Sequence, residues 1–565
     1  MNWRVNALYF IFIAVFTLLI TKLFYWQVVR GGELSREAQT QHQTGEALSA
    51  PRGSILASDG TWLAATTQAW LIFAQKPDLK ESPRAVANKL APLLVDKDLL
   101  PEAMRIEGLL SKEGAVWIPI QHKISNETKK NIEALDIAGI SFQSEDDRVY
   151  PEASDAAHLL GFVGKNDDGS DRGYFGLEGF YDLSLSGKSG FVQREEDARG
   201  LPILFGSGKE ISAVPGVDVK THIDKTIQGI LEKHLKDGIE KYGAISGNIT
   251  IMDPYTGAVL GMAAYPSYDP AHYSEYSNDL FKNPIISDSF EPGSIFKPLV
   301  MAAGLDAGVI KPDTKCDICG EPYKVDKYKI ETWDGKYHPD STMTDVIVHS
   351  DNVGMAFIGT KLGADKLYDY LSKYGLGEAS GIDLQGEQAP QLREKGSWNV
   401  VDLATTTFGQ GIAVTPIEMI RAMAVIANGG KIVKPQVVDK IIKDGWEEDV
   451  KPEIGSKVLS DKAISDIKEM MVLAVKNGES KWAVPEGFSI AGKTGTAQIP
   501  VAGHYDTSKT IASFIGFSPA EKPRFIMLVT LREPKTSQWG SETAAPLWFN
   551  ISKDLFPYLG IQPQN

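Results

Sequence analysis

An apolar segment near the N-terminus constrains this chain more than any other feature. From Ala7 to Val29 its only charged side chain is Lys22, and it has the ~20 residues that a helix needs to cross a bilayer. Lys22 lies toward one end, where a lysine can extend its ammonium group to the headgroups. Tyr25 and Trp26 fit the aromatic belt at a membrane interface. The segment therefore predicts a transmembrane helix, with the rest of the chain outside the bilayer.

The flanks of this segment predict its orientation. Residues 1–6 include Arg4 and no acidic side chain, and basic flanks favour the cytoplasmic side. No small-x-small cleavage pattern follows, which favours an uncleaved anchor over a removed signal peptide. We therefore expect a single-pass protein of the plasma or inner membrane. Residues 1–6 would be a cytoplasmic tail and residues 7–29 the anchor, with the chain from residue 30 on the periplasmic or extracellular side.

The length and composition predict several ordered domains. The chain has 565 residues, of which 43% are hydrophobic, and a net charge of −15, which argues against nucleic acid as a partner. Residues 31–50 are polar and predict a helical stalk. More broadly, residues 30–215 show short strands and Gly/Asp turns without a catalytic constellation, which predicts an extended, β-rich pedestal domain.

Residues 216–560 predict a second domain of the α+β class. A helix after Asp224 and a β-hairpin at 247–263 come first, and a long helical region extends to about residue 430. The remaining predicted elements are strands at 490–497, 510–517 and 525–531 and a helix at 544–555. An antiparallel sheet flanked by its terminal helices, with a helical lobe inserted, accounts for this order.

The stretch Glu291–Pro298 carries the first chemical motif. A Pro-Gly turn leads Ser294 into the first turn of a helix, and Lys297 follows three residues later on the same helix face. A lysine whose pKa is lowered by burial can activate a serine nucleophile. The backbone N–H of Ser294 at a helix start could also hold an oxyanion. Taken alone, Ser-x-x-Lys is common by chance, and it favours a helix-capping serine with an unrelated surface lysine.

Two later motifs decide between these interpretations. Ser350-Asp351-Asn352 offers a hydroxyl and an amide at a corner after a predicted helix. Lys493, Thr494, Gly495 and Thr496 lie in a predicted strand, where glycine permits the close approach of another backbone. Such a strand can bind a peptide along its edge while its lysine and threonine side chains bind a carboxylate. Ser-x-x-Lys, Ser-Asp-Asn and Lys-Thr-Gly in this order are typical of class A β-lactamases and penicillin-binding proteins.

The chain as a whole resembles a class B penicillin-binding protein, the monofunctional peptidoglycan D,D-transpeptidases. The predicted second domain would then have the fold that these enzymes share with serine β-lactamases, and the pedestal would resemble their dimerisation domain. Phe290-Glu291-Pro292-Gly293 resembles the division branch more than the elongation branch. Further matching stretches are Arg52-Gly53, 158–164, 176–179, 253–257, 408–411 and Thr415-Pro416.

The resemblance implies a role for each motif residue. Ser294 would attack the penultimate D-Ala carbonyl of a stem peptide ending in D-Ala-D-Ala, with Lys297 as its base. Ser350 would relay a proton to the leaving amine, and Asn352 would hold Lys297 and the substrate amide. The terminal carboxylate would bind to Lys493 and Thr494. Thr496, beyond Gly495, would supply the second oxyanion N–H.

The resemblance also implies the partners. β-Lactams would acylate Ser294, and an amino group of a second stem peptide would resolve the substrate's acyl-enzyme. A membrane glycosyltransferase and proteins of the division or elongation complex would be further partners, and no cofactor or metal is implied. Ile295 and Asp351 depart from residues common in the family, which could alter antibiotic affinity.

The two cysteines, Cys316 and Cys319, stand apart from these motifs. His338 and His349 lie too far along the chain to complete a convincing metal site, which needs about four ligands. The pattern favours a structural disulfide or two free thiols. His349 is interpreted as a packed neighbour of Ser350.

Three other functions share some of these features. A β-lactamase would carry the same triplets but would normally lack an anchor and a pedestal. A bifunctional synthase would need a helical glycosyltransferase where residues 31–215 predict strands and turns. A membrane scaffold with a vestigial site would not need the intact motifs.

Overall fold

The computed structural model describes residues 2–34, 43–151, 155–167, 169–195, 209–501 and 504–564. The chain divides into two compact units. The first comprises Met1–Arg52 and Ser186–Gly216, and the second comprises Gly53–Leu185 and Val217–Asn565. The expected boundary between pedestal and second domain at residues 215/216 remains a prediction.

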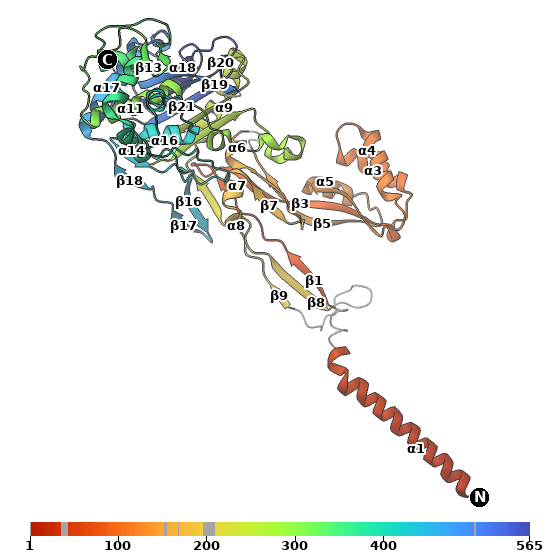
Figure 1. Ribbon diagram of the computed structural model, residues 1–565. Coiled ribbons are helices and arrows are strands. Elements are labelled where there is room, and N and C mark those ends of the chain that lie inside the picture. The colour runs from red at the N-terminus through yellow and green to blue at the C-terminus, as the bar shows by residue number, and fades with distance from the viewer. Residues whose placement is uncertain are drawn as a thin grey trace. The chain divides into compact units, whose positions relative to one another are not determined.

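The first unit contains the apolar helix. Helix α1 (Asn2–Phe24), red in Figure 1, continues into a π-helical turn at Tyr25–Val29. Its apolar side chains are exposed, and the segment Trp3–Val29 is long and apolar enough to span a membrane. The hydroxyl of Thr17 donates to the Ile13 carbonyl at 2.7 Å, which satisfies a polar group that the bilayer interior could not.

The predicted helical stalk at residues 31–50 is wrong over its second half. Strand β1 (Gln43–Leu48) pairs antiparallel with β8 (Gly190–Glu195), which also pairs with β9 (Lys209–Ile211). Pairing with a strand about 150 positions further along the chain overrides a local polar pattern, and Gly45 is a poor helix former. Residues 35–42 of the predicted stalk lie outside the described residues.

The second unit begins with a long antiparallel ladder. As predicted, β2 (Ile55–Leu56) and β3 (Trp62–Gln75) form two strands around the Asp59-Gly60 turn. β3 also pairs with β4 (Trp117–Ile124) and β5 (Ile140–Val149). Helices α3 (Pro83–Leu94), α4 (Leu99–Leu110) and α5 (Asn126–Glu133) accompany these strands, and Ser82 caps α3 as its sequence predicts.

This sheet continues into segments far along the chain. β2 pairs with β10 (Asp218–Thr221), which pairs with β16 (Val438–Lys443) and, through it, with β17 (Trp446–Asp449). Smaller elements before β10 are α6 (Ala157–Leu160), β6 (Phe162–Lys165), β7 (Asp171–Tyr174), α7 (Gly176–Phe180) and α8 (Asp182–Leu185). Because β2 is hydrogen-bonded to β10, which follows residue 217, residues 53–185 belong to the same compact unit as the C-terminal half of the chain.

A buried ion pair joins three parts of this region. Arg148 on β5 donates to Glu178 on α7 at 2.7 Å and to the carbonyl of Gly53 at 2.7 Å. The two charged side chains are 6% and 0% exposed. A Cβ on Gly53 would lie 1.9 Å from the Val217 carbonyl oxygen, so only glycine allows this approach.

The central sheet of the second unit has the order β12-β11-β21-β20-β19, and Figure 1 shows β19–β21 at the C-terminal, blue end of the chain. Its strands are β11 (Ser246–Met252), β12 (Val259–Tyr265), β19 (Ala491–Val501), β20 (His504–Ser518) and β21 (Phe525–Arg532). All pairs are antiparallel. The predicted α+β fold and hairpin are confirmed.

Both faces of this sheet are covered. Phe525, Met527 and Val529 pack with α9 (Lys225–Tyr242) and α18 (Ala544–Tyr558), whereas Ile526 and Leu528 belong to the core with the helical lobe. Successive residues of a strand point to opposite faces, so β21 carries apolar residues toward both layers over residues 525–529. Sequence periodicity alone does not reveal which of its residues faces which layer.

The helical lobe lies between β12 and β19 in the chain. Its helices are α10 (Pro284–Ser287), α11 (Lys297–Asp306), α12 (Met343–Val348), α13 (Asn352–Leu362), α14 (Ala364–Lys373), α15 (Val400–Thr406), α16 (Pro416–Ala427) and α17 (Asp461–Asn477). The predicted long helical region is interrupted by a hairpin of β13 (Tyr323–Val325) and β14 (Tyr328–Ile330). β15 (Lys431–Val433) and β18 (Ile454–Lys457) form a second small pair.

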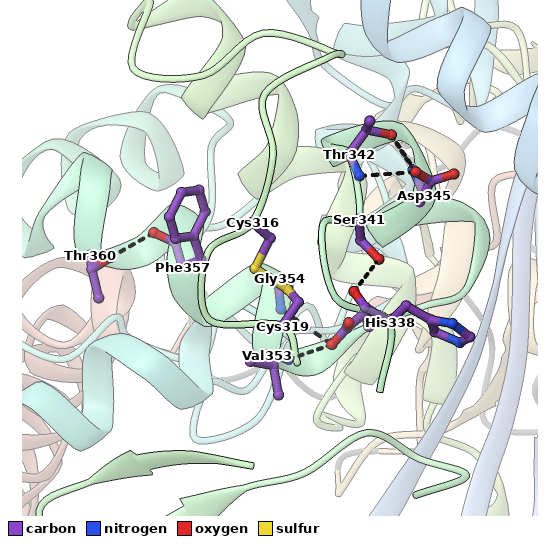
Figure 2. Close-up of a disulfide and its surroundings, with 11 residues drawn as sticks. Cys316, Cys319, His338, Ser341, Thr342, Asp345, Val353, Gly354, Phe357 and Thr360 are labelled. Carbon is purple, nitrogen blue, oxygen red and sulfur yellow. Dashed lines mark hydrogen bonds between the residues drawn. A yellow bond between two sulfur atoms is a disulfide. The ribbon is translucent and has the colours of Figure 1, made fainter. Parts of the chain in front are cut away.

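Cys316 and Cys319 form a disulfide (Figure 2), one of the two states that the sequence favours. Both are buried in the core of the lobe. The backbone N–H of Cys316 donates to the Ser341 carbonyl at 2.8 Å, just before Thr342 caps α12. The bridge thus fixes the segment that leads into the corner holding Ser350.

The ion pair Arg148–Glu178 gives a first prediction. Glu178→Gln keeps the side-chain shape but leaves the buried guanidinium without a counter-charge, so the unfolding free energy should fall by about 3–5 kcal/mol. Denaturant unfolding followed by circular dichroism measures this. The matched control is Asp171→Asn at the exposed pair Lys165–Asp171, which should cost about 0–1 kcal/mol. Equal effects at the two sites would contradict the structural role assigned to Arg148–Glu178.

Candidate active site

Ser294 lies in a 3₁₀ turn, Gly293–Phe296, that leads directly into α11. Gly293 has a φ of +57°, a conformation that glycine adopts without strain. Its N–H donates to the carbonyl of Gly409 at 3.0 Å. Ile295 and Phe296 are fully buried, whereas Ser294 is half-buried. The apolar neighbours therefore anchor the turn and leave the serine facing a pocket.

Lys297 is fully buried one turn further along. Its Nζ donates to the Ser350 carbonyl at 2.6 Å and to Asn352 Oδ1 at 2.7 Å, and lies 3.2 Å from Ser350 Oγ. Two strong acceptors account for both N–H groups of a neutral amine. A neutral Lys297 would therefore keep its lone pair free to receive a proton from a hydroxyl group.

The surroundings of Lys297 favour this neutral form. Burial holds the pKa of its amine well below the ordinary value, and the positive charge of Lys493 lowers it further. Asp351 and Glu479 act in the opposite direction. No ion pair to Lys297 occurs among the described residues, so desolvation dominates.

The corner between α12 and α13 holds Ser350, Asp351 and Asn352, as the sequence predicts. Ser350 has a φ of +57°, which is uncommon for a residue with a side chain and costs about 1 kcal/mol or more. Asp351 Oδ1 caps α13 by accepting from Val353 and Gly354. Asn352 Nδ2 donates to the Glu331 carbonyl at 3.0 Å. These contacts hold the Ser350 carbonyl and the Asn352 amide oxygen toward Lys297.

Lys493–Thr496 lie on β19, the edge strand of the central sheet. Lys493 is 3% exposed, and its Nζ lies 3.2 Å from both the carbonyl and the hydroxyl of Thr494. Burial lowers the pKa of Lys493 to about 8. A Cβ on Gly495 would come within 2.8 Å of Ile295 Cγ2, so glycine lets the strand approach the serine turn.

These segments meet at one pocket of about 80 Å³. All eight predicted site residues lie at it or directly behind it: Ser294, Ser350, Asn352, Thr494, Gly495 and Thr496 line it, and the buried amines of Lys297 and Lys493 contact Ser350, Asn352 and Thr494. The other lining residues are Gly293, Trp333, Phe408, Gln410, Glu479 and Trp539.

Three pocket residues were not predicted from the sequence: Trp333, Glu479 and Trp539. The two tryptophan rings meet edge to face with centroids 5.2 Å apart. The N–H of Gly540, next to Trp539, donates to Thr496 Oγ1 at 2.9 Å. None of these residues belongs to a recognised motif, so only the fold reveals their place beside Ser294.

Two family descriptions match the chain. The penicillin binding protein transpeptidase domain matches residues 247–553, and the penicillin-binding protein dimerisation domain matches residues 47–221. The first covers the central sheet from its second residue onward, the helical lobe and every residue of the pocket.

Individual proteins are similar over nearly the whole chain. Stage V sporulation protein D of Bacillus subtilis is 32% identical over 558 residues, covering 98% of this chain and 85% of its own length. The peptidoglycan D,D-transpeptidase FtsI of Escherichia coli is 27% identical over 564 residues, covering 100% and 93%. The crystal structure of penicillin binding protein 2X from Streptococcus thermophilus has a TM-score of 0.76 at 25% identity, covering 91% and 80%.

Proposed function

The chain belongs to the class B penicillin-binding proteins and is a serine peptidoglycan D,D-transpeptidase; we propose which of its residues perform the reaction. Ser294 is the nucleophile and Lys297 the base that activates it. The observation that carries this assignment is the burial of the Lys297 amine between two acceptors, without an ion pair among the described residues. A buried lysine of lowered pKa can take a proton near neutral pH.

Acylation then proceeds from Ser294. Its Oγ loses a proton to Lys297 and attacks the carbonyl of the penultimate D-Ala, and the C–N bond to the terminal D-Ala breaks. Ser350 Oγ, 3.2 Å from Lys297 Nζ, passes the proton to the leaving amine. Asn352 fixes Lys297 and offers its amide group to the substrate peptide.

The edge strand β19 holds the substrate. Lys493 and Thr494 bind the terminal carboxylate, and Gly495 lets the strand approach the serine turn. The backbone N–H groups of Ser294 and Thr496 stabilise the oxyanion. The hydrogen bond from the Gly540 N–H to Thr496 Oγ1 helps to hold this strand in position. β-Lactams follow the same route up to the acyl-enzyme.

We further propose a septal role and an outer location. The similarity to FtsI of Escherichia coli supports action at division. The apolar helix and Arg4 support a single-pass anchor with a cytoplasmic N-terminus. Residues 30–215 then act as a pedestal and residues 216–560 as the catalytic domain. A membrane glycosyltransferase and other division proteins are the expected partners, because residues 30–215 show no catalytic constellation.

Covalent labelling tests the nucleophile. The full-length chain in detergent is incubated with a fluorescent penicillin, and the modified peptide is mapped by mass spectrometry. We expect a stable adduct on Ser294 that disappears in Ser294→Ala. An adduct on another residue, or no adduct on folded protein, would refute the assignment. Rapid turnover of the drug without an accumulating adduct would identify a β-lactamase-like hydrolase.

The two buried lysines predict a bell-shaped pH dependence of acylation. The rate should fall toward acid as Lys297 becomes protonated, and toward alkali as Lys493 loses its charge near its pKa of about 8. Lys493→Arg retains the positive charge at high pH, so the alkaline limb should move up by about one pH unit or more. Second-order acylation rates from pH 5 to 10 measure this. An alkaline limb that Lys493→Arg does not move would show that Lys493 does not cause it.

A further inference from the structure

A second cavity adjoins the catalytic pocket. It has a volume of about 290 Å³ and shares Trp333 and Glu479 with the pocket around Ser294. The other lining residues that bear on its chemistry are Thr332, Asp351, Lys336, His338, His349 and Lys481. The reaction steps assigned to the donor peptide make no use of this space.

Two buried polar groups at this cavity lack a partner. Asp351 is 3% exposed, and its Oδ2 forms no hydrogen bond within the described part of the chain, whereas its Oδ1 caps α13. The hydroxyl of Thr332, a residue 9% exposed, is likewise without a hydrogen bond there. An unsatisfied buried polar atom is costly, so two of them at one cavity wall point to a polar ligand.

Glu479 lies where the cavity and the pocket meet. It is half-buried and makes no hydrogen bond or ion pair with any described residue. Burial lowers the pKa of both Lys297 and Lys493, and the negative charge of Glu479 acts in the opposite direction on each lysine. The Glu479 carboxylate also lines the same pocket as Ser294, so it lies near the reaction centre. Trp333, 42% exposed, offers an aromatic ring at the same boundary.

Among the charged groups that line this cavity, none forms an ion pair with Glu479. Lys336 lies 3.6 Å from Asp334 and is paired with it. Lys481 is exposed to solvent. His338 and His349 stack on each other with ring centroids 4.8 Å apart. A carboxylate beside an aromatic ring is a favourable environment for an ammonium group.

We propose that this cavity binds the acceptor stem peptide, with Glu479 and Trp333 holding its ammonium group beside the acyl-enzyme. Asp351 Oδ2 and the Thr332 hydroxyl bind polar groups of the peptide next to that amine. This inference rests on the proposed role of Ser294, because the acceptor must reach the acyl carbon on its Oγ. It assigns a second substrate site that is separate from the carboxylate-binding strand β19.

The second half-reaction transfers the acyl group from Ser294 to the nitrogen of the acceptor. The bound ammonium loses one proton to water, and its nitrogen attacks the acyl carbon to form the new C–N bond. Lys297 takes a second proton from that nitrogen and gives it to Ser294 Oγ as the C–Oγ bond breaks. The products are an amide cross-link and free Ser294.

The partition of the acyl-enzyme between amine and water tests the proposal, because this ratio does not depend on how fast the acyl-enzyme forms. The full-length chain is given a D-alanyl thioester donor with D-alaninamide as a cationic acceptor or methanol as a neutral one. Glu479→Gln should lower the ratio of aminolysis to hydrolysis about tenfold. The ratio of methanolysis to hydrolysis should stay within about twofold. Glu486→Gln, an exposed carboxylate outside both cavities, is the matched control and should change neither ratio.

The alternative outcomes are distinguishable. An unchanged aminolysis ratio in Glu479→Gln, or an equal fall with amine and methanol, would overturn the acceptor site and leave the role of Ser294 intact. A chain without substitutions that forms no acyl-enzyme with the thioester would refute the proposed nucleophile, and the acceptor site with it.

Discussion

The burial of one amine governs the arrangement of this site. Lys297 has no exposed surface and donates to Ser350 and Asn352. Burying a charged ammonium is expensive, so the protein favours the neutral base. The strained backbone of Ser350 contributes the acceptor carbonyl that this arrangement needs, and the Asp351 cap on α13 supports the same corner. The free-energy cost of burying the amine is thus offset by the hydrogen bonds and packing that the helical lobe provides around it.

The fold brings together segments separated by 200 residues because the central sheet and the lobe share one core. The turn at Ser294 starts α11, which lies in the core between the lobe and one face of the sheet. Glycines then set the distances: a Cβ on Gly540 would lie 2.2 Å from the Gly495 carbonyl oxygen. The edge strand β19 can approach the segment after Trp539 because Gly540 has no side chain there, and it can approach Ile295 of the serine turn because Gly495 has none.

The sequence predicted three features that have local patterns: the class of fold, the anchor segment and the eight motif residues that meet at the pocket. Asp224, Ser82 and Thr342 begin helices through short-range caps. It failed at residues 43–48, where pairing with β8 outweighs local preference, and it did not find Glu479 or Trp333. Their place depends on long-range packing of segments that carry no motif. Asp351 was predicted as the middle residue of the Ser-Asp-Asn motif and as a departure from residues common in the family, but its role as the cap of α13 was not predicted.

The protonation state of Lys297 tests the account most directly. The full-length chain labelled with ¹³Cε-lysine would be titrated by NMR, with the Lys297 signal assigned by its loss in Lys297→Arg. The account predicts a titration midpoint well below the ordinary lysine value of 10.5. A midpoint at or above that value would mean a charged Lys297, and the assignment of this residue as the base would be wrong.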